Sequence, residues 1–137
     1  MKEADALRGL EAASRLAALS PQTQARLEVW DRAGLPVGLW VPSAFIQIGR
    51  AIASKRQPVS DRDLARLFTE IERLMHSTDG VIANAVATDL LEAVSTGALE
   101  SGFDFSRVDP HLGRESRRYL LAWDDFLGQK TPGLTRR

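Results

Sequence analysis

The sequence predicts an all-α protein folded as one domain. Apolar residues recur with a helical period almost throughout, and no stretch alternates apolar and polar residues over the length of a strand. The 137 residues, 44% of them hydrophobic, are enough to bury a single core without metals or disulfides. We expect a bundle of about six helices, with HEAT-like hairpins as one arrangement, over residues 1–127, and a flexible tail over 128–137.

The first three helices are predicted from composition and from capping signals. Residues 3–19 are rich in Ala and Leu, which favour a helix, although the leucines do not share one face. Ser20 and Pro21 form a start signal, because the hydroxyl can cap a helix and proline fits the first helical position. Residues 35–42 place two prolines and a glycine among large apolar residues. They predict a partly buried loop, followed by a helix over 43–54.

The fourth helix has the clearest pattern. Ser60 and Asp63 form a variant of the capping box, with Asp in place of Glu. The apolar residues that follow span an arc of roughly 120° on a helix. They are Leu64, Leu67, Phe68, Ile71, Leu74 and Met75. A further helix is expected over residues 79–94, ending near Gly97, and the short link predicts an antiparallel hairpin. Residues 112–127 predict a final amphipathic helix.

Charge and composition narrow the function. Lys plus Arg (18) equals Asp plus Glu (18), whereas proteins that hold nucleic acid or membrane surfaces usually carry a basic surplus. The absence of cysteine excludes thiol catalysis and thiolate zinc sites and fits a reducing compartment. There is no apolar run of transmembrane length, and the N-terminus lacks the apolar core of a signal peptide. We therefore expect a cytoplasmic protein with no membrane partner.

Polar residues within the 79–94 helix are the first candidates for a site. Asn84, Thr88, Glu92 and Ser95 are spaced by four, four and three residues, so they form one stripe on a helix, flanked by Asp89. The stripe faces either water, as in most half-polar helices, or a partner. We expect a partner to contact part of this stripe together with charged residues of neighbouring helices. The candidate partner-binding residues are Glu72, Asp79, Asn84, Asp89, Glu92, Arg117, Asp124 and Asp125.

The sequence contains no catalytic or metal-binding signature. Glu72, Asp89 and Glu92 could converge as in a metal-binding bundle, but such a site uses Glu-x-x-His pairs from two helices. His76 follows Glu72 by four residues, and no second pair exists. The G-x-S-x-G elbow and glycine-rich phosphate loops are absent as well. We expect no enzymatic activity, no cofactor and no metal, with a hydrolase or metal enzyme using these three carboxylates as a remote third hypothesis.

A basic face is the alternative site, with a nucleic-acid-binding regulator as the function it would serve. It consists of Arg50, Lys55, Arg56, Arg62, Arg66 and Arg73. The connector between its two helices contains Pro58 and is longer than the tight turn of a helix-turn-helix motif. Nearby carboxylates dilute the charge, so a solvated face is favoured.

Three tryptophans complete the candidates. Trp30, Trp40 and Trp123 are expected in the core or at its edge, because aromatic rings dominate burial in small domains. A tryptophan that is exposed would instead mark a hot spot for protein binding.

The stretch "LARLFTEIERLMHSTDGVIANAVATDLLEAV" resembles a family of small all-helical bacterial proteins of the polymorphic-toxin neighbourhood. In that family a helix "L-x-x-(I/L)-F-x-x-I-E-x-L", a short acidic turn and a helix "V-x-N-A-(V/I)-x-T-x-(F/L)-L-E-x-(L/V)" follow one another. The matching residues include Phe68, Glu72, Asp79, Asn84, Thr88 and Glu92. The resemblance implies an immunity protein that neutralises a cognate toxin by stoichiometric binding. It describes the scaffold and implies no particular binding residue.

Overall fold

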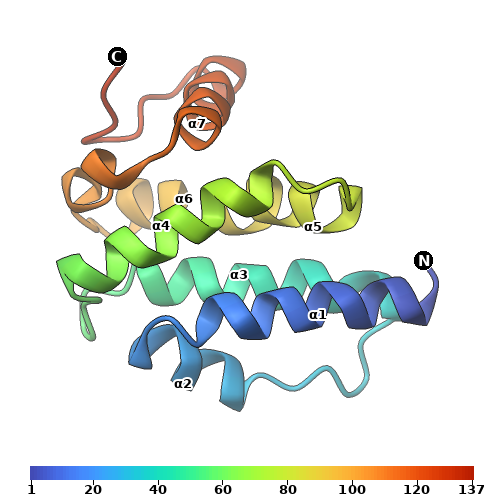
Figure 1. The fold of residues 1–137 in the computed structure, drawn as a ribbon. Helices are drawn as coiled ribbons and strands as arrows, with labels where there is room; N and C mark the ends of the chain where they lie inside the picture. The colour runs from blue at the N-terminus through green and yellow to red at the C-terminus, as the bar shows by residue number, and fades with distance from the viewer.

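Seven α-helices, one π-helical segment and three short 3-10 turns make up the computed structural model, which describes residues 1–137 and contains no strand (Figure 1). Helix α5 (Gly80–Asn84), the π segment (Ala85–Leu91) and α6 (Glu92–Glu100) follow one another without interruption and form one central helix. The all-α, single-domain prediction is confirmed. Because α5 and α6 belong to the same continuous helix, the seven α-helices form six separate helical segments.

The first half of the chain contains α1 (Glu3–Ala17), α2 (Pro21–Val29) and α3 (Trp40–Ile52). The predicted cap of α2 is present, since the Ser20 hydroxyl accepts a hydrogen bond from the backbone N–H of Thr23 at 3.1 Å. Helix α3 begins three residues before the predicted position and follows a 3-10 turn at Val37–Leu39. The loop prediction was too long because Pro42 lies in the first turn of α3, where no amide donor is needed.

The predicted hairpin is formed by α4 (Asp61–Met75) and the central helix. The Ser60 hydroxyl caps α4 through the N–H of Asp63 at 3.2 Å, and the leucine-rich face of α4 is buried as predicted. However, the central helix packs mainly on α3 rather than on α4, and α3 lies between it and the α1–α2 pair (Figure 1). It also continues past Gly97, the predicted end, to Glu100. The missing side chain of Gly97 serves packing instead, because a Cβ there would lie 2.6 Å from the Cβ of Ala53.

Helix α7 (Arg114–Leu127) packs on α4 and the central helix, on the side of them that faces away from α3 (Figure 1). Its N-terminus is capped from another helix by the Glu72 carboxylate. This group accepts hydrogen bonds from the N–H of Glu115 (2.9 Å), the N–H of Ser116 (3.0 Å) and the Ser116 hydroxyl (2.8 Å). Gly128, with a φ of 65°, ends the helix in the left-handed conformation that glycine favours.

Residues 129–137, which we call the C-terminal strap, lie back against the domain, whereas the sequence led us to expect a flexible tail over 128–137. Thr131 is buried, and it donates from its N–H (2.7 Å) and its hydroxyl (2.8 Å) to the Asp124 carboxylate. The Thr135 N–H donates to Asp109 at 2.9 Å. Buried polar groups with satisfied hydrogen bonds hold this segment in place.

A single cluster of buried apolar side chains connects α1, α3, α4, the central helix and α7. The fully buried aromatic rings are Phe45, Phe68 and Phe105. None of the helices combines the length and apolar character needed to cross a bilayer.

Candidate functional site

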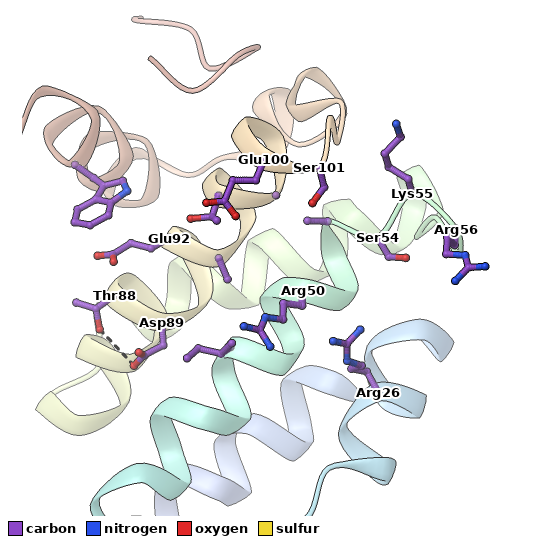
Figure 2. Close-up of a pocket in the computed structure, with 16 residues that line it drawn as sticks. Arg26, Arg50, Ser54, Lys55, Arg56, Thr88, Asp89, Glu92, Glu100 and Ser101 are labelled. Atoms are coloured by element: carbon purple, nitrogen blue, oxygen red, sulfur yellow. Dashed lines mark hydrogen bonds between the residues drawn. The ribbon is translucent and has the colours of Figure 1, made fainter. Parts of the chain in front are cut away.

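A groove of about 630 Å³ runs between α3 and the central helix (Figure 2). We call it the bipolar groove, because one wall is basic and the other acidic. The basic wall carries Arg26, Arg50, Lys55 and Arg56, and the acidic wall carries Asp89, Glu92 and Glu100. Small residues, among them Ala53, Ala93 and Gly97, lie between the walls, and Trp123 of α7 also borders the groove.

The π segment positions the acidic wall. A π turn takes up one more residue than an α turn, so the side chains after it are rotated by roughly 100°. In this helix Leu90 and Leu91 are both fully buried, while Asp89 and Glu92 border the groove. The segment lies where the backbone of α3 comes closest: a Cβ on Gly49 would lie 2.6 Å from the Leu90 carbonyl oxygen. Such π segments are frequent at functional sites.

The two inner carboxylates of the groove are half-buried and lack a cationic partner. Burial raises the pKa of Asp89, and a weak hydrogen bond from the Thr88 hydroxyl (3.4 Å) opposes this shift. Burial also raises the pKa of Glu92, the hydroxyl of Tyr119 lowers it by donating a hydrogen bond, and the negative charge of Asp89 raises it further. A partly desolvated carboxylate pair of this kind favours a cation from outside the chain.

The basic wall is also unpaired. Arg26 donates from Nε to the Gln47 amide oxygen at 3.0 Å, and Arg50, Lys55 and Arg56 are exposed. The structure has ten ion pairs, and none of them includes a charged residue of the bipolar groove. In Figure 2 the arginines and Lys55 lie on one side and Asp89, Glu92 and Glu100 on the other. Opposite charges are thus held apart across the groove.

An aromatic pair lies beside the acidic wall. The rings of Trp123 and Phe126 stack with centroids 6.5 Å apart, and Phe126 is 82% exposed. The indole N–H of Trp123 is buried and has no hydrogen-bond partner in the chain. By contrast, Trp30 donates to Ser43 (2.8 Å) and Trp40 to the Leu35 carbonyl (3.0 Å). Trp123 is therefore the tryptophan whose indole N–H has no hydrogen-bond partner.

The candidate partner-binding residues do not form one surface. Asp89 and Glu92 line the bipolar groove, whereas Asn84 is exposed beside a different hollow that also involves Asp89. Asp79 caps α5 through the N–H of Val81 at 3.0 Å, and its carboxylate lies 3.8 Å from Arg8. The predicted polar stripe is divided, because Ser95 is buried against Thr131 of the strap.

The remaining candidates act mainly within the chain. Glu72 caps α7, Asp124 binds the strap, and the buried Arg117 donates to the Asp109 carboxylate at 2.6 Å. Asp125 is exposed and pairs with Arg136 at 2.5 Å. Side chains that are covered and already hydrogen-bonded offer little to a partner, and this applies to Glu72, Arg117 and Asp124.

The residues of the hypothetical metal site and of the basic face do not gather as two separate sites. No group of three Asp, Glu or His side chains is close enough to hold a metal ion, so Glu72 does not join Asp89 and Glu92. On the basic face, Arg66 and Arg73 pair with carboxylates of their own helix. Sequence reasoning missed Arg26 and Glu100, which reach the groove from separate helices and carry no local signal.

Comparisons of the chain with protein-family models, with curated proteins and with solved structures gave no match.

Proposed function

We propose that this protein is an immunity-type inhibitor, which neutralises a bacterial toxin by binding it in a stoichiometric complex. The observation that carries the proposal is the bipolar groove with the aromatic pair beside it. Its charges of both signs have no ion-pair partners in the chain, and Phe126 exposes a large apolar ring. The resemblance of the α4–central-helix hairpin to immunity-type proteins adds the toxin as the partner.

The chemistry of the groove suits a protein partner. Interface hot spots are enriched in Trp, Tyr and Arg, and the groove and its border supply Trp123, Arg26 and Arg50. Unpaired charges of both signs accelerate encounter with a complementary surface and select its orientation. The small residues between the walls leave room for a partner's backbone or side chains.

Titration calorimetry with the toxin domain encoded beside this gene tests the proposal. We expect one-to-one binding and at least about tenfold weaker binding for Trp123→Ala/Phe126→Ala, because aromatic anchors dominate such interfaces. Leu39→Ala is the matched control, since Leu39 is 51% exposed and precedes the opposite end of α3. The absence of heat at micromolar concentrations of both proteins would refute the proposal.

A nucleic-acid-binding regulator is the second candidate, favoured by the gathering of four cationic side chains on one wall of the groove. Its binding would weaken steeply with salt, because phosphate contacts release counterions. A gel-shift series between low and physiological salt tests this candidate, and an absent or salt-insensitive shift removes it.

A further inference from the structure

We propose that the bipolar groove binds a partner segment that inserts an arginine or lysine beside Asp89, Glu92 and Trp123 and presents carboxylates to Arg50 and Lys55. This inference rests on the proposed function in one respect, namely that the partner is a protein. It goes further by specifying the charge pattern of the docking segment and the direction in which that segment lies across the groove.

The acidic end of the groove has the features of a site for a cationic side chain. Tyr119 donates to Oε2 of Glu92, whereas the Thr88 hydroxyl donates to the Asn84 carbonyl at 2.8 Å and lies 3.4 Å from Oδ2 of Asp89. Each carboxylate therefore retains at least one oxygen without a donor. A guanidinium presents several N–H donors in a planar fork and can bond two such oxygens at once. The indole of Trp123 also borders the groove, and an aromatic ring at this position can attract the same cation.

The basic end has the complementary features. Arg50, at the end of α3, and Lys55, in the following connector, are exposed and have no carboxylate within ion-pair distance. In Figure 2 they lie across the groove from Asp89 and Glu92. A segment that carries both charge signs satisfies the two walls in one orientation only, because reversal would bring like charges together.

The acidic wall distinguishes this partner from a polyanion. A nucleic acid would be attracted by the basic wall but repelled by Asp89, Glu92 and Glu100 along the opposite wall. The spacing of the two helices below the groove is fixed, because Gly49 and Gly97 allow close contact between the end of α3 and the central helix. We therefore expect the segment to enter a preformed groove with little rearrangement of the helices.

The decisive variant is Asp89→Asn/Glu92→Gln. It removes both charges, keeps both shapes, and leaves the Tyr119 hydroxyl an amide oxygen to which it can donate. Since burial already disfavours both charged forms, folding is expected to survive, and circular dichroism checks this. Glu3→Gln/Glu11→Gln on α1 is the matched control, because neither residue borders the groove.

Four probes are used with each protein. Binding of the toxin domain encoded beside the gene is followed by calorimetry, and binding of a DNA or RNA oligonucleotide by gel shift. Binding of the blocked tripeptides acetyl-Gly-Arg-Gly-amide and acetyl-Gly-Asp-Gly-amide is followed by amide and indole NMR shifts. We expect the groove variant to bind the toxin at least about tenfold more weakly and the control to bind within about twofold of the original. We expect the arginine peptide to shift resonances of Thr88–Ala93 and Trp123 only while the carboxylates of Asp89 and Glu92 are intact. Acetyl-Gly-Asp-Gly-amide should shift Arg50–Arg56 instead.

The outcomes separate the two proposals. Toxin binding that is unchanged in the groove variant overturns this inference and leaves the immunity function standing. If the toxin does not bind the original protein, the immunity function fails and the arginine peptide alone decides the inference: localised shifts support it, and their absence overturns it. Stronger binding of a DNA or RNA oligonucleotide by the groove variant would identify a polyanion as ligand and also overturn it.

Discussion

Removal of the Glu72 carboxylate is expected to loosen α7 from the bundle. This side chain accepts three hydrogen bonds, at 2.9, 3.0 and 2.8 Å, from the first turn of α7. Loss of a helix cap costs about 0.5–2 kcal/mol, and an unsatisfied buried donor costs about 1–3 kcal/mol. Ser116 is fully buried, so Glu72→Ala should lower the free energy of unfolding by about 3 kcal/mol. Glu72→Gln retains an acceptor and should cost about 1 kcal/mol.

Urea unfolding followed by circular dichroism measures both values. Glu70→Ala is the matched control, because Glu70 lies on the same helix and makes only a surface ion pair with Arg73, and pairs of this kind contribute little to stability. Burial alone would raise the pKa of Glu72, but the hydrogen bonds from Glu115 and Ser116 lower it below its ordinary value of 4.5. The stabilisation is therefore complete above that pH and is lost on acidification. A loss below about 0.5 kcal/mol for Glu72→Ala at neutral pH would refute the role of Glu72 as a cap.

Three further predictions concern the strap, acid stability and helix packing. A chain ended after Gly128 lacks the buried Thr131, and we expect its free energy of unfolding to fall by about 2–4 kcal/mol in a urea titration. Burial opposes ionisation of Asp109, but hydrogen bonds from the strap and from two arginines lower its pKa from 3.8 to about 2. The Asp109 carboxylate should therefore contribute about 2 kcal/mol to the free energy of unfolding above pH 4, and this contribution should disappear as the pH falls towards 2. The Asp109→Asn variant should lack this part of the pH dependence. Gly49→Ala places a Cβ 2.6 Å from the Leu90 carbonyl oxygen, so we expect a loss of about 1–3 kcal/mol, and an unchanged melting temperature would contradict the close contact.

The helices were predictable where their signals are local. Ser20 and Ser60 cap the helices that their sequence context predicted, and the apolar period of α4 identified its buried face. Pro42 was misinterpreted, because a proline in a first turn and a proline in a loop look alike in sequence. The π segment gave no local signal, since it lies where the central helix packs closely on Gly49 of α3.

The strap was unpredictable for a different reason. Its residues are mostly polar and include Pro132 and Gly133, which is typical of a mobile terminus. It is held by Asp109, Asp124 and Ser95, which lie between 7 and 36 residues away in the sequence. Long-range polar contacts of this type leave no periodic pattern in the chain.

The candidate site was predicted in part. Asp89 and Glu92 were identified as polar residues on a largely apolar helix, and Arg50 was assigned to a basic face. That these residues face one another across a groove depends on the packing of α3 against the central helix, which the sequence pattern did not indicate. From the sequence, Glu72 and Arg117 look as exposed as Asp89 and Glu92, but both form hydrogen bonds with distant parts of the chain.

The central claim is that the protein functions by binding a toxin. Titration calorimetry of the unmodified chain with a toxin domain encoded next to its gene is the decisive measurement. We expect one-to-one binding with a dissociation constant in the nanomolar range or below, as in other tight protein inhibitors. No heat at micromolar concentrations, with both proteins shown to be folded, would contradict it.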